Sequence, residues 1–232
     1  MKKILLPIVV LSLGLGSCSK ILDQQPQSSL DAATAYTTRQ GVEAGLLGSY
    51  NTLQSGNYYG LRFWALGDLE TDILQHTGTF PSFAQFSNRA LLSDNTEITN
   101  MWATIYNGIN RVNNIIAAAP LITDPAFNAN QAVAEARFLR GLFYFDLIRG
   151  FGGSANGYNK GSGLGVPLFI KPTLTPGDAA PKPRSTEAEI YTQIVSDIDF
   201  AIANLPVTAA NGRANVNVAT SIKARLELYR EN

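Results

Sequence analysis

Residues 131–149 read QAVAEARFLRGLFYFDLIR and form the most apolar stretch with helical spacing in this chain. At about 100° per residue, this spacing predicts a helix with two separate apolar faces. One face holds Ala132, Ala136, Leu139, Phe143 and Leu147, and the other holds Ala134, Phe138, Gly141, Phe145 and Ile148. A helix that is apolar on two sides has to be packed on both sides. We therefore expect residues 131–149 to form an inner helix of a stacked helical array.

Four further stretches carry apolar residues at three- and four-residue spacing, which predicts amphipathic helices. They are residues 38–54, 98–119 and 187–205, and a last stretch that begins near Val218. Thr186 and Glu189 fit a capping box at the start of the third stretch, and Pro120 and Pro206 end two of the helices. The pattern therefore predicts an all-α fold. Because the last helical pattern still continues at Asn232, we expect the natural protein to extend further.

The first residues have the features of a secretory signal. Lys2 and Lys3 precede an apolar run over residues 4–15, which is too short to span a bilayer comfortably. The sequence LGSC at residues 15–18 resembles a lipobox, which predicts a signal peptide over residues 1–17 and a lipid anchor on Cys18. The alternative is an ordinary signal peptide followed by a chance cysteine. If Cys18 is lipidated, residues 18–37 form a lipidated tether and entry segment. Two acyl chains suffice for stable anchoring.

The composition argues against several classes of partner. Without Lys2 and Lys3, 16 of the 18 basic side chains remain against 18 acidic ones, so the net charge is near −2. A balance of this kind argues against nucleic acid binding and against electrostatic membrane binding, which leaves the lipid anchor as the membrane contact. The polar but weakly charged surface suits neutral ligands.

Three motifs resemble one known family. Residues 102–113, WATIYNGINRVN, are similar to the W-x-x-x-Y-x-x-I-x-x-x-N helix of SusD/RagB proteins. Residues 135–147, EARFLRGLFYFDL, resemble the most recognisable segment of that family, and Phe151-Gly152-Gly153 follows it. Residues 183–185, PRS, lead into Tyr191, Ile194, Asp197 and Ile198, which match the next family helix. The motifs occur in the family's order and cover most of the chain after Cys18.

The chain also departs from the family pattern. Gly141 stands where the family usually has alanine, and residues 154–165 separate Gly153 from Val166-Pro167-Leu168, which are contiguous with it in the family. The C-terminal half of the family, which supplies part of the ligand surface, has no counterpart in this sequence. A complete binding site is therefore not expected within these residues.

The resemblance implies a fold, a location and a function. It implies tetratricopeptide-like helix pairs stacked as a right-handed superhelix with long irregular loops, in a SusD-like N-terminal helical domain over residues 38–232 that is incomplete at its C-terminus. It also implies a lipoprotein exposed at the outer membrane, which binds oligosaccharide or another nutrient and delivers it to a TonB-dependent, SusC-like barrel. Such a protein binds without cleaving. The alternative is a non-catalytic helical scaffold of the transporter complex without glycan specificity of its own.

The sequence offers little for catalysis. His76 is the only histidine, so a His-rich metal site is excluded and a Ser-His-Asp triad would depend on this one residue. Asp68, Glu70 and Asp72 could offer a carboxylate pair for glycoside hydrolysis, although solvated acids or hydrogen bonds to ligand hydroxyls are simpler interpretations. The glycine-rich residues 161–165 lack the lysine of a phosphate-binding loop. We therefore expect no catalytic residues, no metal and no cofactor.

The candidate ligand residues lie in residues 55–95, one of two regions without helical period; the other is residues 150–184. Aromatic rings stack on the C–H faces of sugars, while amides and carboxylates bind sugar hydroxyls. On that basis the candidates are Trp64, Asp68, Asp72, Phe80, Phe83, Phe86 and Arg89. The alternative assigns Phe63 and Trp64 to the core. Trp102 is expected in the core, and Arg137 and Arg140 are expected to pair with Glu135, Asp146 or helix-end carbonyls.

Overall fold

The structure is a computed structural model that describes residues 32–153, 163–210 and 212–230. These residues are all-helical and contain isolated β-bridges but no strand. The helices are α2 (Ala32–Ala35), α3 (Arg39–Gln54), α4 (Arg62–Leu69), α5 (Pro81–Ser87), α6 (Thr96–Ala118), the 3-10 turn η3 (Ala119–Leu121), α7 (Ala129–Phe151), α8 (Glu187–Asn204) and α9 (Val216–Arg230). The predicted signal peptide, Cys18 and most of the predicted tether lie outside the described residues. The right-handed, tetratricopeptide-like stacking remains a prediction.

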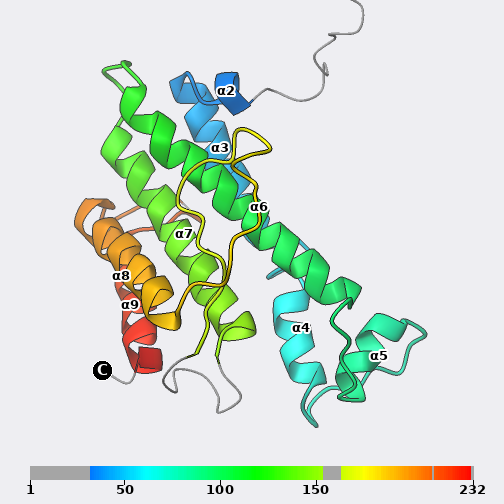
Figure 1. Cartoon of the computed structure of the whole chain (residues 1–232). Helices are drawn as coiled ribbons and strands as arrows, with labels where there is room; N and C mark the ends of the chain where they lie inside the picture. Colours follow the sequence, from blue (N-terminus) through cyan, green and yellow to red (C-terminus); the bar gives the residue numbers. More distant parts are fainter. Residues whose placement is uncertain (1–31, 154–162, 211, 231–232) are drawn as a thin grey trace, which may run out of the picture.

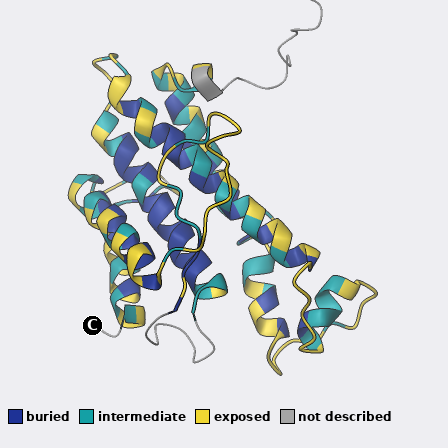
Figure 2. Cartoon of the chain, viewed as in Figure 1, coloured by how far each residue is buried: buried dark blue, intermediate teal, exposed yellow. Residues whose placement is uncertain are grey.

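Helix α7 is the centre of the fold. It lies between α6 and α8, with α3 and α9 completing its surroundings (Figure 1). All ten residues of the two predicted apolar faces are buried, so the prediction of an inner helix packed on both sides is confirmed. Figure 2 shows burial continuing along most of α7, whereas α8 and α9 are buried on one face only.

The predicted helix ends agree closely with the structure because the capping residues are present. The Thr186 hydroxyl accepts a hydrogen bond from the Glu189 amide, and the Glu189 carboxylate accepts one from the Thr186 amide, as in a capping box. Helix α6 begins two residues earlier than the predicted residue 98 because the Asn95 side chain accepts from the amides of Glu97 and Ile98.

Residues 55–95 contain two helices that the helical period did not reveal. Helices α4 and α5 have eight and seven residues, which is too short for an apolar period to be recognised. Helix α5 begins with Pro81 at its first turn, a position that tolerates proline because no amide donor is needed there. We call residues 55–95 the α4–α5 lobe, and it projects from the N-terminal end of α6, away from α8 and α9 (Figure 1).

Residues 163–186 form the second non-helical segment, which crosses α6 and α7 (Figure 1). Gly153, Leu164 and Thr186 pair through two isolated bridges at its ends. Among residues 32–153, 163–210 and 212–230, no helix combines the length and apolar character needed to span a bilayer.

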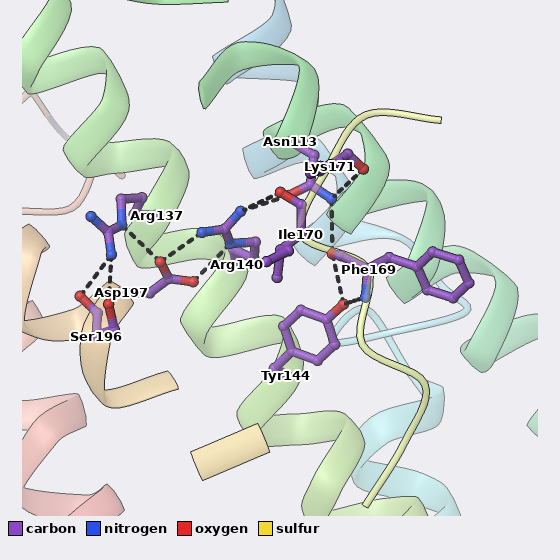
Figure 3. Close-up of polar contacts among 9 residues, drawn as sticks. All are labelled: Asn113, Arg137, Arg140, Tyr144, Phe169, Ile170, Lys171, Ser196 and Asp197. Atoms are coloured by element: carbon purple, nitrogen blue, oxygen red, sulfur yellow. Dashed lines mark hydrogen bonds and ion pairs between the residues drawn. The ribbon is translucent and has the colours of Figure 1, made fainter. Parts of the chain in front are cut away.

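Arg137 and Arg140 form ion pairs with a partner other than the predicted ones. Both guanidinium groups bind Asp197 of α8, with Nε–O distances of 2.7 Å each (Figure 3). Arg137 also donates to the backbone carbonyl of Ser196. The prediction that Arg137 and Arg140 have a structural role is confirmed. The prediction that they pair with Glu135 or Asp146 is wrong. Asp197 lies on α8, 57 residues after Arg140 in the sequence, so closeness in the sequence could not identify it as the partner.

Candidate functional site

Helix α4 carries one of the two exposed aromatic rings of the predicted set. Trp64 is 57 % exposed, which contradicts its alternative assignment to the core. Its ring packs against Tyr59 and Phe63, with centroid distances of 5.3 and 5.1 Å. Asp68 follows four residues later, so Trp64 and Asp68 lie on one exposed face of α4.

A buried carboxylate on α7 anchors this aromatic group. The hydroxyls of Tyr58 and Tyr59 both donate to Oδ2 of Asp146, over 2.6 Å in the case of Tyr59. Arg149 forms an ion pair with the other carboxylate oxygen. Burial raises the pKa of Asp146 above its usual value, although Arg149 and the two tyrosine hydroxyls oppose this shift. The rings below Trp64 are therefore fixed to the central helix.

Helix α5 and its N-cap residue Phe80 carry the second group of predicted rings. Phe80 is 66 % exposed and meets Phe83 edge-on at 6.4 Å between centroids. Phe83 is partly buried and packs beside the His76 ring at 5.7 Å. Phe86 is only 4 % exposed and belongs to the core. The prediction that Phe86 contacts a ligand therefore has poor support, because its ring is buried against other side chains.

The remaining predicted residues lie on the surface of the α4–α5 lobe. Asp72 is exposed in the turn after α4. Arg89 is exposed with φ of 52°, and its amide donates to the Phe86 carbonyl at the end of α5. Among the described residues, no ring–ring contact joins Trp64 and its neighbours Tyr59 and Phe63 to Phe80 and Phe83. In the described part of the chain, no cluster of histidine, cysteine and acidic side chains could hold a metal ion.

The α4–α5 lobe also exposes several large aliphatic side chains. They are Leu61, Ile73, Leu74, Leu91 and Leu92, which are 40–79 % exposed. Beneath the lobe, Phe63, Phe86, Ile98, Met101, Arg149 and Phe151 contribute to a mainly apolar cavity of about 340 Å³. Concentrated apolar exposure of this kind marks a surface that contacts a ligand or a protein.

A second hollow lies on α6, around Trp102, which was expected in the core. Trp102, Tyr106, Asn107, Asn110, Phe169 and Lys182 line a cavity of about 390 Å³, together with neighbouring residues of the crossing segment. We call it the α6 groove. Trp102 packs partly against the core, as expected, and contacts Phe151 edge-on at 4.9 Å. The spacing of Trp102, Tyr106 and Asn110 by four residues each was a signal for a shared helix face.

Comparison with known proteins gives a consistent result. A family model of SusD-like proteins, described as "Starch-binding associating with outer membrane", matches residues 20–228. A SusD-like protein of Formosa agariphila is 30% identical over 224 residues, which are 96% of this chain and 41% of that protein. A SusD-like protein of Bacteroides ovatus is 25% identical over 234 residues, which are 99% of this chain and 40% of that protein.

Solved structures agree with the fold. A SusD superfamily protein of Bacteroides thetaiotaomicron matches with a TM-score of 0.70 and 30% identity, over 84% of this chain and 43% of that one. A putative sugar binding protein of Bacteroides vulgatus matches with a TM-score of 0.73 and 27% identity, over 85% of this chain and 44% of that one. The chain thus spans about two fifths of the length of the curated relatives it matches.

Proposed function

This chain belongs to the SusD-like family, and on that premise we propose that it is part of a surface protein that captures oligosaccharide without cleaving it. The observation that carries this proposal is the pair of exposed rings on the α4–α5 lobe, Trp64 and Phe80. Exposed rings offer flat apolar faces for the C–H faces of a sugar. Asp68, Asp72 and Arg89 lie on the same lobe and supply acceptors and donors for hydroxyl groups.

The location and the partner follow from the same premise. We propose that residues 1–17 are a signal peptide, that Cys18 carries the lipid anchor, and that residues 18–37 connect it to a helical domain over residues 38–232. The anchored protein would lie at the outer surface of the outer membrane and deliver its ligand to a SusC-like, TonB-dependent barrel. The family description, which names starch and the outer membrane, supports this proposal.

Binding to a glycan array tests the capture proposal. We expect the purified protein to bind an oligosaccharide, and Trp64→Ala and Phe80→Ala each to weaken that binding by about threefold to tenfold, since an aromatic contact contributes about 0.5–1.5 kcal/mol. Leu121→Ala is the control because Leu121 is 78 % exposed and lies far along the chain, after α6. Binding that survives both aromatic substitutions would remove the α4–α5 lobe as the ligand site.

The exposed aliphatic residues of the lobe favour a second candidate, a scaffold that contacts other proteins of the transporter complex. In that case the lobe would bind no glycan. Leu92→Asp and Ile73→Asp would instead release the protein from the barrel in a co-purification experiment. If these variants lose glycan binding but still co-purify with the barrel, capture is favoured. If they keep glycan binding but no longer co-purify with the barrel, the scaffold is favoured.

A further inference from the structure

Three aromatic rings form one wall of the α6 groove. The Trp102 and Tyr106 rings are 4.8 Å apart between centroids and inclined by 43°. Phe169 of the crossing segment meets Tyr106 edge-on at 5.9 Å. Since Trp102 and Tyr106 are one turn apart on α6, their rings form a continuous apolar surface beside the crossing segment.

Partly buried hydrogen bonds fix the crossing segment against α6 and α7. The Tyr106 hydroxyl donates to the Pro167 carbonyl over 2.7 Å, and the Phe169 amide donates to the Tyr144 hydroxyl over 2.7 Å. The Asn113 side-chain amide donates to the carbonyls of Phe169 and Lys171 over 2.9 and 3.1 Å. The backbone that carries the Phe169 ring is therefore held in place at several points.

A second layer of polar contacts holds Asn113 itself. Arg140 donates to the Asn113 side-chain oxygen over 2.8 Å and is in turn paired with Asp197 (Figure 3). Figure 3 shows the Phe169 ring directed away from these polar groups. A groove with a rigid wall loses little conformational entropy when a ligand binds, which favours binding.

The groove also presents polar groups that the fold does not use. The side chain of Asn107 is exposed and forms no hydrogen bond with the described residues. Asn110 accepts a hydrogen bond from the Thr173 amide over 2.8 Å, and its side-chain amide has no acceptor among the described residues. An amide can both donate and accept, as the hydroxyl groups of a sugar require.

The charge of the groove distinguishes it from the α4–α5 lobe. Lys182 is the only charged residue in its lining, which contains no aspartate or glutamate. The Lys182 ammonium lies 4.5 Å from the Phe169 ring centroid and 3.4 Å from the Leu168 carbonyl oxygen. An ammonium group has three donors, so Lys182 keeps donors for an anionic group in the groove.

We propose that the α6 groove is a second carbohydrate site that binds an acidic oligosaccharide. One sugar ring stacks on Trp102 and Tyr106, Asn107 and Asn110 bind its hydroxyls, and Lys182 binds its carboxylate or sulfate. The assignment of the ligand as a carbohydrate rests on the function proposed above. The location of the site does not, because the groove shares no residue with the α4–α5 lobe.

The two tryptophans of the chain allow the two sites to be measured separately. Trp64 lies on the lobe and Trp102 in the groove, and the sequence contains no other tryptophan. In the Trp64→Phe protein, selectively excited tryptophan emission reports the groove alone, and in the Trp102→Phe protein it reports the lobe alone. The probes are a hexamer of galacturonate, a sulfated galactose hexamer and the neutral maltohexaose.

We expect an acidic hexamer to change the fluorescence of Trp102 saturably in the Trp64→Phe protein, with maltohexaose binding at least about fivefold more weakly. In that background, Lys182→Gln should weaken acidic binding by about fivefold to tenfold, and Asn107→Ala by about threefold. Asn217→Ala, an exposed asparagine on α9, is the matched control. Comparing the galacturonate with the sulfated hexamer identifies which anion is preferred.

Two results would overturn the proposal: no saturable change of Trp102 fluorescence with either acidic hexamer, or equal affinity for maltohexaose. Failure of the function proposed for the lobe would look different. It would leave the Trp64 fluorescence of the Trp102→Phe protein unchanged by every sugar, whatever Trp102 reports.

Discussion

At Asp197 a single carboxylate holds two guanidinium groups. The Asp197 side chain is 0 % exposed, and it pairs with Arg140, which is 6 % exposed, and with Arg137 at the surface of α7. Removing one partner of a buried ion pair leaves the other charge without compensation. Arg140 also donates to Asn113, so Arg140 connects α8 to the wall of the α6 groove.

We therefore expect Asp197→Ala to lower the free energy of unfolding by about 3–5 kcal/mol. Asp199→Ala on the same helix is the matched control. Asp199 pairs with Lys223 at the surface, where 47 % and 33 % of the side chains are exposed, so its loss should amount to less than about 1 kcal/mol. Urea unfolding followed by circular dichroism measures both values, and similar losses for the two variants would contradict this account.

Asp146 should give the stability an unusual dependence on pH. Since burial raises the pKa of its carboxyl in the folded protein, the folded state binds the proton more readily than the unfolded state. The contribution of Asp146 is then present at low pH and declines as pH rises through the raised pKa. We expect the unfolding free energy of the unmodified protein, minus that of Asp146→Asn, to fall as pH rises above about 4, which is near the ordinary pKa of aspartate.

Asp178 provides the opposite sign as a control. Hydrogen bonds from Thr175 and Leu174 lower the pKa of this exposed carboxyl, so its contribution is present at neutral pH and declines as pH falls. The corresponding difference for Asp178→Asn should therefore rise with pH only below about pH 4, which is near the ordinary pKa of aspartate, and stay constant above it. If the difference for Asp146→Asn also rose with pH, burial would not govern the pKa of Asp146.

At the scale of the elements, Gly108 of α6 lies where both α3 and α7 pack against this helix. A Cβ atom there would lie 2.9 Å from the Phe143 ring of α7 and 3.0 Å from the Thr52 methyl group of α3. Phe143 is completely buried, so its ring has no free space to move into. The absence of a side chain at this position therefore sets how near the three helices can lie.

We expect Gly108→Ala to destabilise the protein. Overpacking costs about 1–3 kcal/mol and the helix propensity of alanine returns about 1 kcal/mol, which leaves a net loss of up to about 2 kcal/mol. Gly150→Ala in α7 is the control, because a Cβ there meets nothing within 4 Å and should stabilise by about 0.5–1 kcal/mol. Thermal unfolding of both proteins measures the difference, and a stabilising Gly108→Ala would contradict close packing.

In the whole molecule, stability should be distributed unevenly. Helix α7 is buried along its length, whereas α4 and α5 pack mainly on each other and on α6. Local opening is easiest where few apolar contacts have to be broken. We expect amide hydrogens of α5 to exchange at least about tenfold faster than those of α7. Hydrogen exchange with mass spectrometry measures this, and equal protection would indicate one cooperative unit that includes the lobe.

The sequence by itself determined the helical class, five of the helices and the burial of α7 on two sides. Apolar period, capping residues such as Thr186 and prolines after helices act over a few residues, so they can be read locally. Only the tertiary structure decided that Phe86 is buried while Trp64 is exposed, that Asp197 is the partner of Arg140, and that Phe169 joins Trp102 in a groove. These features depend on which elements meet, because burial and ion pairing join residues far apart in the chain.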